Sequence, residues 1–288
     1  MQQNTPQNIT ITTSDHYALS ATLYEPPASG QRMVLLNAAM GVKQSYYADY
    51  AAYLAEQGFV VLTYDYRGIG QSRNGTLRGF PATMLNWACD DQTAALRYLT
   101  AHYPGHKLLI VGHSLGGQIL GLTPDYARVS GLLGVASQSG YWRGWDGRLR
   151  LRMILLWHVV IPLLARLYGY FPARLVGMGS HDIPARVVLD WANAGRKPYY
   201  LRSEYSGTLF DHFVAVTTPL RLYSFADDDY APFRTVENLR ALYSNAPSEH
   251  RHVTPQEVGA DKIGHFGFFR KQFKDSLWAE SAAWLKER

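Results

Sequence analysis

Short, continuous apolar runs alternate with helix-length segments through the first half of the chain, and this alternation constrains the fold more than any other feature. Residues 33–36, 59–62 and 108–111 contain no polar side chain, which is typical of strands covered on both faces of a sheet. Helical spacing occupies residues 45–58 and about 82–102 between these runs. We therefore predict an α/β fold with a mostly parallel central sheet and helices on both faces.

The alternation stops after Ser137. Residues 140–204 are helical in pattern, rich in aromatics and interrupted by four prolines, and a strand-like pattern resumes at Pro219. This predicts a core made of residues 1–139 and 205–288 with a helical cap inserted at 140–204. We expect this cap to be a lid that forms an apolar pocket wall, unless it packs without touching substrate. Its aromatic residues are Trp142, Trp145, Trp157, Tyr168, Tyr170 and Trp191.

Composition excludes several classes of protein. The 288 residues are 47% hydrophobic and 18% charged, which excludes disordered and fibrous chains. Cys89 is the single cysteine, so no internal disulfide is expected.

Residues 1–6 lack the basic and apolar stretches of a signal peptide. The most apolar run, residues 153–165, has 13 residues and contains His158, whereas a membrane-spanning helix needs about 20. We expect a cytoplasmic protein without a transmembrane segment.

One motif carries chemistry. Gly112-His113-Ser114-Leu115-Gly116 matches G-x-S-x-G, directly after the apolar run 108–111 and before a segment that can open a helix. A serine at such a sharp strand-to-helix turn is crowded, so its flanks must be glycine. A helix N-terminus would also offer N–H groups to a developing oxyanion. The pattern predicts a nucleophilic Ser114 rather than an incidental serine in a glycine-rich turn.

Two further motifs make a resemblance specific. With Asp65-Tyr66-Arg67-Gly68-Ile69-Gly70-Gln71-Ser72 and Gly264-His265-Phe266-Gly267, the chain resembles the α/β-hydrolase superfamily over nearly its whole length. Residues 226–232 and 263–270 are similar to a group of predicted serine hydrolases that has no assigned substrate. The resemblance implies the α/β-hydrolase fold and its catalytic apparatus, but no reaction partner.

A serine nucleophile needs a base, and the base needs an orienting carboxylate. The superfamily order Ser, acid, His and the flanking glycines favour His265 as the base. The superfamily's acid commonly stands four residues before a proline, which selects Asp228 with Pro232, and Asp227 is the alternative acid. The other histidines are expected to be structural or solvated. We interpret His113 as structural, His158 and His181 as cap residues, and His102, His106, His250 and His252 as solvated.

The superfamily forms its oxyanion hole from two backbone amides. One is expected from Leu115 and the other from the segment after residues 33–36. Here the sequence reads Asn37-Ala38-Ala39-Met40-Gly41 instead of the usual His-Gly pair. Ala39 is the choice and Met40 the alternative.

These residues together predict a serine hydrolase that cleaves a carboxylic ester, or a related acyl substrate, through a Ser-His-Asp triad and an acyl-enzyme. An acyltransferase, thioesterase or small-peptide hydrolase would use the same residues, and a ligand-binding module on a hydrolase scaffold is a further alternative. No cofactor and no metal are expected, because metal-ligand spacings, a phosphate loop and a complete dinucleotide fingerprint do not occur.

The net charge of +5 is unevenly distributed. Residues 140–204 hold ten Lys/Arg and four Asp/Glu, a net of +6, and the remainder holds 18 against 19, a net of −1. Because the core has no basic stripe, we expect no nucleic-acid partner. The basic cap could attract acidic, apolar or amphipathic small-molecule acyl substrates, rest on a membrane surface, or be a solvated face. The oligomeric state is not predicted.

Overall fold

A computed structural model describes residues 5–28 and 30–288. Residues 1–4 lie outside the described residues, and so does most of the segment 1–6 in which we expect no signal peptide. The core is one sheet of eight strands in the order β1-β2-β4-β3-β5-β6-β9-β10. β1 pairs antiparallel with β2, and β2 with β4, while every other pair is parallel. The strands are β1 Gln7–Thr12, β2 Ala18–Tyr24, β3 Arg32–Asn37, β4 Val60–Tyr64, β5 Lys107–His113, β6 Val129–Val135, β9 Leu220–Phe225 and β10 Ser248–Val253.

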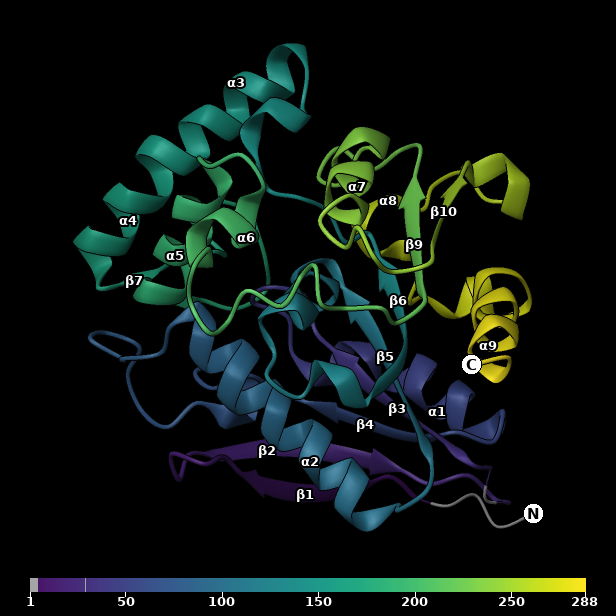
Figure 1. The fold of residues 1–288 in the computed structure, drawn as a ribbon. Coiled ribbons are helices and arrows are strands. Elements are labelled where there is room, and N and C mark those ends of the chain that lie inside the picture. The colour runs from purple at the N-terminus through teal and green to yellow at the C-terminus, as the bar shows by residue number, and fades with distance from the viewer. Residues whose placement is uncertain (1–4, 29) are drawn as a thin grey trace.

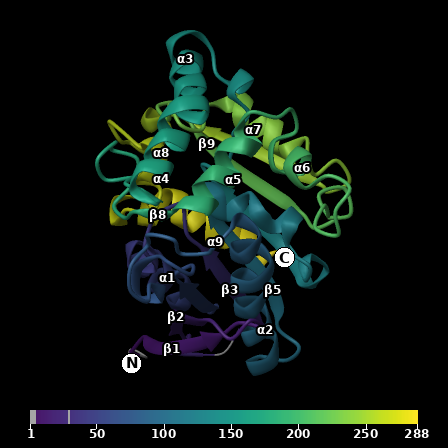
Figure 2. The ribbon, with the colours of Figure 1, turned by 90° about the vertical axis from the view of Figure 1, so that its left-hand side faces the viewer.

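Helices cover both faces of the sheet, as the alternation predicted. α1 (Ala48–Glu56) and α2 (Gln92–His102) lie on opposite faces (Figure 2). The C-terminal α9 (Ala279–Lys286) packs beside α1, where the hydroxyls of Tyr50 and Ser281 lie 2.8 Å apart. The predicted α/β fold with a mostly parallel sheet is therefore confirmed.

A layer of short elements between β6 and β9 lies over one end of the sheet (Figure 1). A small hairpin and four helices make up this layer, and the boundaries of the cap at 140 and 204 stay a prediction. The elements are α3 Gly147–Leu155, α4 Ile161–Tyr168, β7 Tyr170–Phe171, β8 Ile183–Pro184, α5 Ala185–Gly195 and α6 Tyr200–Tyr205.

A π-helical turn, Leu156–Val160, joins α3 to α4 in one continuous helix. The resulting helix, Gly147–Tyr168, has 22 residues and is long and apolar enough to cross a membrane by length and composition. The apolar run 153–165 therefore understates the length of this helix, which continues through the polar flanks of the run. The expectation of no transmembrane segment stays a prediction.

The edge strand β10 is a second difference from the sequence prediction. Its sequence, Ser-Glu-His-Arg-His-Val, is polar and does not resemble a core strand. His250 is not the solvated residue that we expected: its side chain is 5% exposed because α7 (Phe233–Arg240) covers it. Its Nδ1 lies 2.6 Å from Glu237 and its Nε2 lies 2.7 Å from the Ser224 hydroxyl. His252 is partly buried and also contacts Ser224, at 2.7 Å.

Candidate active site

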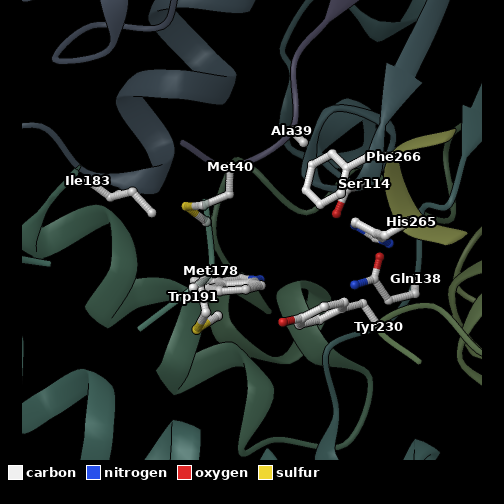
Figure 3. Close-up of a pocket in the computed structure, with 11 residues that line it drawn as sticks. Ala39, Met40, Ser114, Gln138, Met178, Ile183, Trp191, Tyr230, His265 and Phe266 are labelled. Carbon is white, nitrogen blue, oxygen red and sulfur yellow. The ribbon is translucent and has the colours of Figure 1, made fainter. Parts of the chain in front are cut away.

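Three segments far apart in sequence meet at one edge of the sheet. Ser114 follows β5, Asp228 follows β9, and His265 lies in the short helix α8 (Gly264–Gly267). Because β5 and β9 belong to the parallel part of the sheet, their carboxyl ends lie at the same edge. Ser114 and His265 line the same pocket (Figure 3).

The turn at Ser114 has the geometry that its sequence predicts. Ser114 has a φ of +50°, a conformation that L-residues rarely adopt. A Cβ at Gly116 would lie 2.3 Å from the Asn37 carbonyl oxygen, and one at Gly112 would lie 2.3 Å from the amide nitrogen of Gly117. Only glycine therefore fits on either side of the serine.

The segment after Ser114 differs from the expected helix. It forms two short 3₁₀ turns, Ser114–Gly117 and Ile119–Leu122, and no α-helix follows directly. A full helix dipole is therefore not aimed at the serine, since that dipole needs several aligned turns. What remains is the Leu115 amide, which makes no hydrogen bond within the described part of the chain.

Asp228 contacts the imidazole of His265. Its Oδ2 lies 2.8 Å from His265 Nδ1, and the side chains are 0% and 10% exposed, respectively. Its Oδ1 accepts the backbone N–H groups of Tyr230 at 2.8 Å and Ala231 at 3.1 Å. The carboxylate is thus fixed through both oxygens, and Nδ1 is the nitrogen of His265 that it can hold protonated.

Asp227 has a different set of contacts. It accepts the backbone N–H groups of Ile263 at 2.9 Å and Gly264 at 3.0 Å. These bonds fasten the segment that carries His265 but do not reach the imidazole ring. Of the two aspartates that the sequence left open, Asp228 is the one whose carboxylate contacts the imidazole of His265.

The Ser114 hydroxyl points towards the His265 ring in Figure 3. It makes no hydrogen bond within residues 5–28 and 30–288. Such contacts are often long in unliganded enzymes and shorten when substrate binds.

The amide expected from Ala39 is already in use. Its N–H donates to the Tyr47 hydroxyl at 2.8 Å, and this hydroxyl lies 2.8 Å from His113 Nδ1. The other ring nitrogen, His113 Nε2, donates to the His265 carbonyl at 2.9 Å. Burial holds the pKa of His113 well below its usual value, which keeps the ring neutral. In that state the Tyr47 hydroxyl donates to Nδ1.

This chain of hydrogen bonds disfavours Ala39 as a donor of the oxyanion hole. An amide that donates to a buried tyrosine is not free to bind an oxyanion. The Met40 amide makes no hydrogen bond to any described residue, and Met40 lines the pocket. The geometry therefore favours the alternative, Met40, as the partner of Leu115. His113 has the structural role expected of it.

The pocket wall is mainly apolar and comes from both core and cap. Of the six cap aromatics, only Trp191 is among the lining residues, and Trp145 and Trp157 are buried elsewhere in the protein. The indole N–H of Trp145 donates to the Asp229 carbonyl at 2.9 Å and so ties the cap to the acid loop. The lining residues are Ala39, Met40, Ser114, Gln138, Gly177, Met178, Ile183, Trp191, Tyr230, His265 and Phe266.

Sequence reasoning missed several of these lining residues. Gln138 lies three residues after β6, Tyr230 two residues after Asp228, and Phe266 directly after His265. These positions were the only signal in the sequence for a place in the pocket. Gln138 accepts a hydrogen bond from the Gln118 amide at 3.1 Å, which orients its side chain at the pocket.

Two other sequence features lie apart from the pocket. Arg67, within the motif 65–72, forms ion pairs of 2.6 Å with Asp15 and Asp91, so this motif stabilises the loop after β4. Cys89 is partly buried, and burial raises its pKa to about 12. Within the described residues, no group of three or more His, Cys, Asp or Glu side chains could hold a metal ion.

Residues 23–176 match the model of the serine aminopeptidase S33 family. The chain belongs to this family. The resemblance to the α/β-hydrolase superfamily is thereby confirmed, and so is the prediction of a serine hydrolase. No curated protein matches this S33 hydrolase in sequence.

Solved structures extend the likeness to the whole fold. A soluble variant of monoglyceride lipase from Saccharomyces cerevisiae, in complex with a substrate analogue, superposes with a TM-score of 0.68 at 14% identity, covering 99% of this chain and 96% of that one. An esterase from Pyrococcus furiosus gives 0.64 at 15% identity, with 98% and 91% covered. DcsB, in complex with its substrate analogue, gives 0.66 at 15% identity, with 98% and 99% covered. At these identities the likeness concerns the fold alone.

Proposed function

We propose that this S33 hydrolase cleaves carboxylic esters of small apolar or amphipathic acyl substrates through an acyl-enzyme. One observation carries the proposal: the Asp228–His265 pair stands beside Ser114 in a pocket with a mainly apolar wall. In this proposal Ser114 is the nucleophile, His265 the base and Asp228 the residue that orients the base.

Acylation begins when the Ser114 hydroxyl attacks the ester carbonyl and His265 Nε2 takes its proton. Asp228 keeps the other proton on Nδ1 and stabilises the imidazolium. The Leu115 and Met40 amides donate to the oxyanion of the tetrahedral intermediate. His265 then gives its proton to the departing alkoxide, which leaves as an alcohol. Each oxyanion donor typically contributes about 100- to 1,000-fold in rate.

Deacylation repeats these steps with water as the nucleophile. His265 takes a proton from the water, which attacks the acyl carbonyl, and the proton returns to Ser114 as the acid product leaves. No electron acceptor or metal is needed in either half of the reaction.

The pocket chemistry favours an ester over the amino-terminal peptide bond that the family description suggests. An aminopeptidase substrate carries an ammonium group, which binds best to a carboxylate. The eleven lining residues, all within the described chain, include no Asp or Glu. They include Met40, Met178 and Ile183, which suit an acyl chain. A thioesterase or acyltransferase would use the same catalytic residues and differ in leaving group or acceptor.

A substrate panel tests the proposal. p-Nitrophenyl esters of increasing acyl length, matched thioesters and aminoacyl p-nitroanilides are compared on the wild type and on Ser114→Ala, and added alcohols test for acyl transfer. We expect hydrolysis of esters above the other classes and a loss of about 10⁶-fold in kcat on removing the serine. Anilide cleavage in place of ester cleavage would support the peptidase alternative. A folded wild type that hydrolyses none of them would support a ligand-binding module instead.

A further inference from the structure

The continuous helix Gly147–Tyr168 has a buried face and an exposed face. α3 and α4 form the outer edge of the cap at the upper left of Figure 1, with α5 on their inner side. The buried face is held by specific contacts. The indole N–H of Trp157 donates to the Gly140 carbonyl at 3.0 Å, and Arg196 donates to the carbonyl of Trp157, also at 3.0 Å.

The exposed face carries a line of large apolar side chains, which we name the outer stripe. Five residues spaced by four form it, and each is about half exposed or more. They are Leu151 (67%), Leu155 (53%), Val159 (48%), Leu163 (59%) and Leu167 (65%). At about 100° per residue, each step of four turns the line by about 40° in an α-helix. The wider π turn within the helix offsets part of this rotation, and all five side chains are exposed.

Positive charge accompanies the outer stripe. The 22 residues of the helix include four arginines and no Asp or Glu. Arg150 is paired with Asp146 at 2.7 Å. Arg148 and Arg166 are exposed, and neither has a carboxylate partner within the described residues. An apolar line flanked by unpaired cations is the pattern of a helix that lies in the interface of an anionic bilayer.

We propose that the outer stripe docks flat on an anionic lipid bilayer, with its apolar side chains at the boundary between headgroups and acyl chains and with Arg148 and Arg166 at lipid phosphates. A second copy of the chain is a poorer occupant, because stripe-to-stripe pairing would bring the unpaired arginines of both copies together. A spanning orientation is also disfavoured, because it would break the bonds of Trp157 and pull the buried face away from α5.

The docked face lies one helix away from the pocket. Trp157, on the buried side of the same helix, packs edge-to-face on Trp191, with ring centroids 4.5 Å apart, and Trp191 lines the pocket. Docking would therefore bring the pocket wall close to the lipid surface. Binding itself does not depend on the chemistry of Ser114, so it can be measured independently of activity.

Vesicle flotation of the full chain tests the proposal. The vesicles are phosphatidylcholine alone and phosphatidylcholine with phosphatidylglycerol, at low and high salt. We expect flotation with the anionic vesicles at low salt and a sharp decrease at high salt. The double variant Leu155→Ser/Leu163→Ser should lose at least about tenfold in binding. Arg148→Gln/Arg166→Gln should lose the preference for phosphatidylglycerol.

Matched control variants keep the result interpretable. Leu209→Ser removes an 88%-exposed leucine outside the stripe. Arg73→Gln removes an exposed arginine that lies outside the cap. Both should float like the wild type, and all variants should keep the wild-type melting temperature, because exposed side chains contribute little to stability.

Three results would overturn the proposal. The first is a folded wild type that does not float with either vesicle, or stripe variants that float as well as the controls. The second is a concentration-dependent dimer that the stripe variant abolishes without any vesicle binding, which would make a second copy the occupant. The third is bound protein that resists alkaline extraction, which would indicate a spanning helix.

Discussion

Replacing the two neighbouring aspartates separately tests the assignment of the acid. In Asp228→Asn, the side-chain oxygen must stay with the Tyr230 and Ala231 amides, which donate to Oδ1. The new NH₂ group then faces His265 Nδ1, 2.8 Å away in the wild type. A donor at that position forces Nδ1 to accept, and the ring proton moves to Nε2. An Nε2 that carries a proton cannot take one from Ser114.

We therefore expect Asp228→Asn to lower kcat by about 10⁴-fold, the effect of the same tautomer change in the serine proteases. Asp227→Asn keeps one acceptor for the Ile263 and Gly264 amides. It should lower the free energy of unfolding by about 1–3 kcal/mol and lower kcat much less. The assay is ester hydrolysis across pH, with chemical denaturation of each variant in parallel.

The matched pair gives a clear refutation. Equal, mild losses in both variants would remove Asp228 from the proposed mechanism. A large loss in Asp227→Asn together with a mild one in Asp228→Asn would exchange their roles.

Three further predictions concern the surroundings of the serine. Tyr47→Phe leaves the Ala39 N–H and one nitrogen of His113 without their partner and should lower the free energy of unfolding by about 2–4 kcal/mol; an unchanged denaturation midpoint would contradict the network. Burial lowers the pKa of His113 in the folded state, so the unfolded chain binds more protons and stability falls as pH decreases below about 6.5. Between pH 7.5 and 5.5 His113→Gln should remove about 1.4 kcal/mol of this decrease, measured by urea unfolding at both values, and an unchanged pH dependence would show that the ring titrates normally. Gly116→Ala would place a Cβ 2.3 Å from the last carbonyl of β3 and should cost about 1–3 kcal/mol in thermal unfolding, whereas Gly179→Ala, with no atom closer than 3.7 Å, should be tolerated; equal effects would refute the steric reading.

The features that sequence predicted well depend on local patterns. The strands β3, β4 and β5 contain continuous apolar runs, and the Ser114 turn needs its two glycines for steric reasons visible in a short motif. The preference for Asp228 over Asp227 came from the resemblance, through the proline four residues later, because two adjacent aspartates do not differ in local pattern.

What sequence could not predict depends on non-local contacts. The Ala39 amide donates to Tyr47, which the sequence shows only as one residue of the expected helical segment 45–58. His250 is buried because α7 covers a polar edge strand. The spacing of the outer stripe is readable in the sequence, but its exposure depends on which face of the helix packs on α5.

Active-site labelling tests the central claim most directly. The folded wild type is treated with a fluorophosphonate, and the intact mass and the modified peptide are determined. A nucleophilic Ser114, activated by His265, should be labelled stoichiometrically at that residue. Ser114→Ala should remain unlabelled, and Asp228→Asn should react far more slowly. A folded wild type that takes no label, or takes it at a different residue, would contradict the proposed Ser114 chemistry.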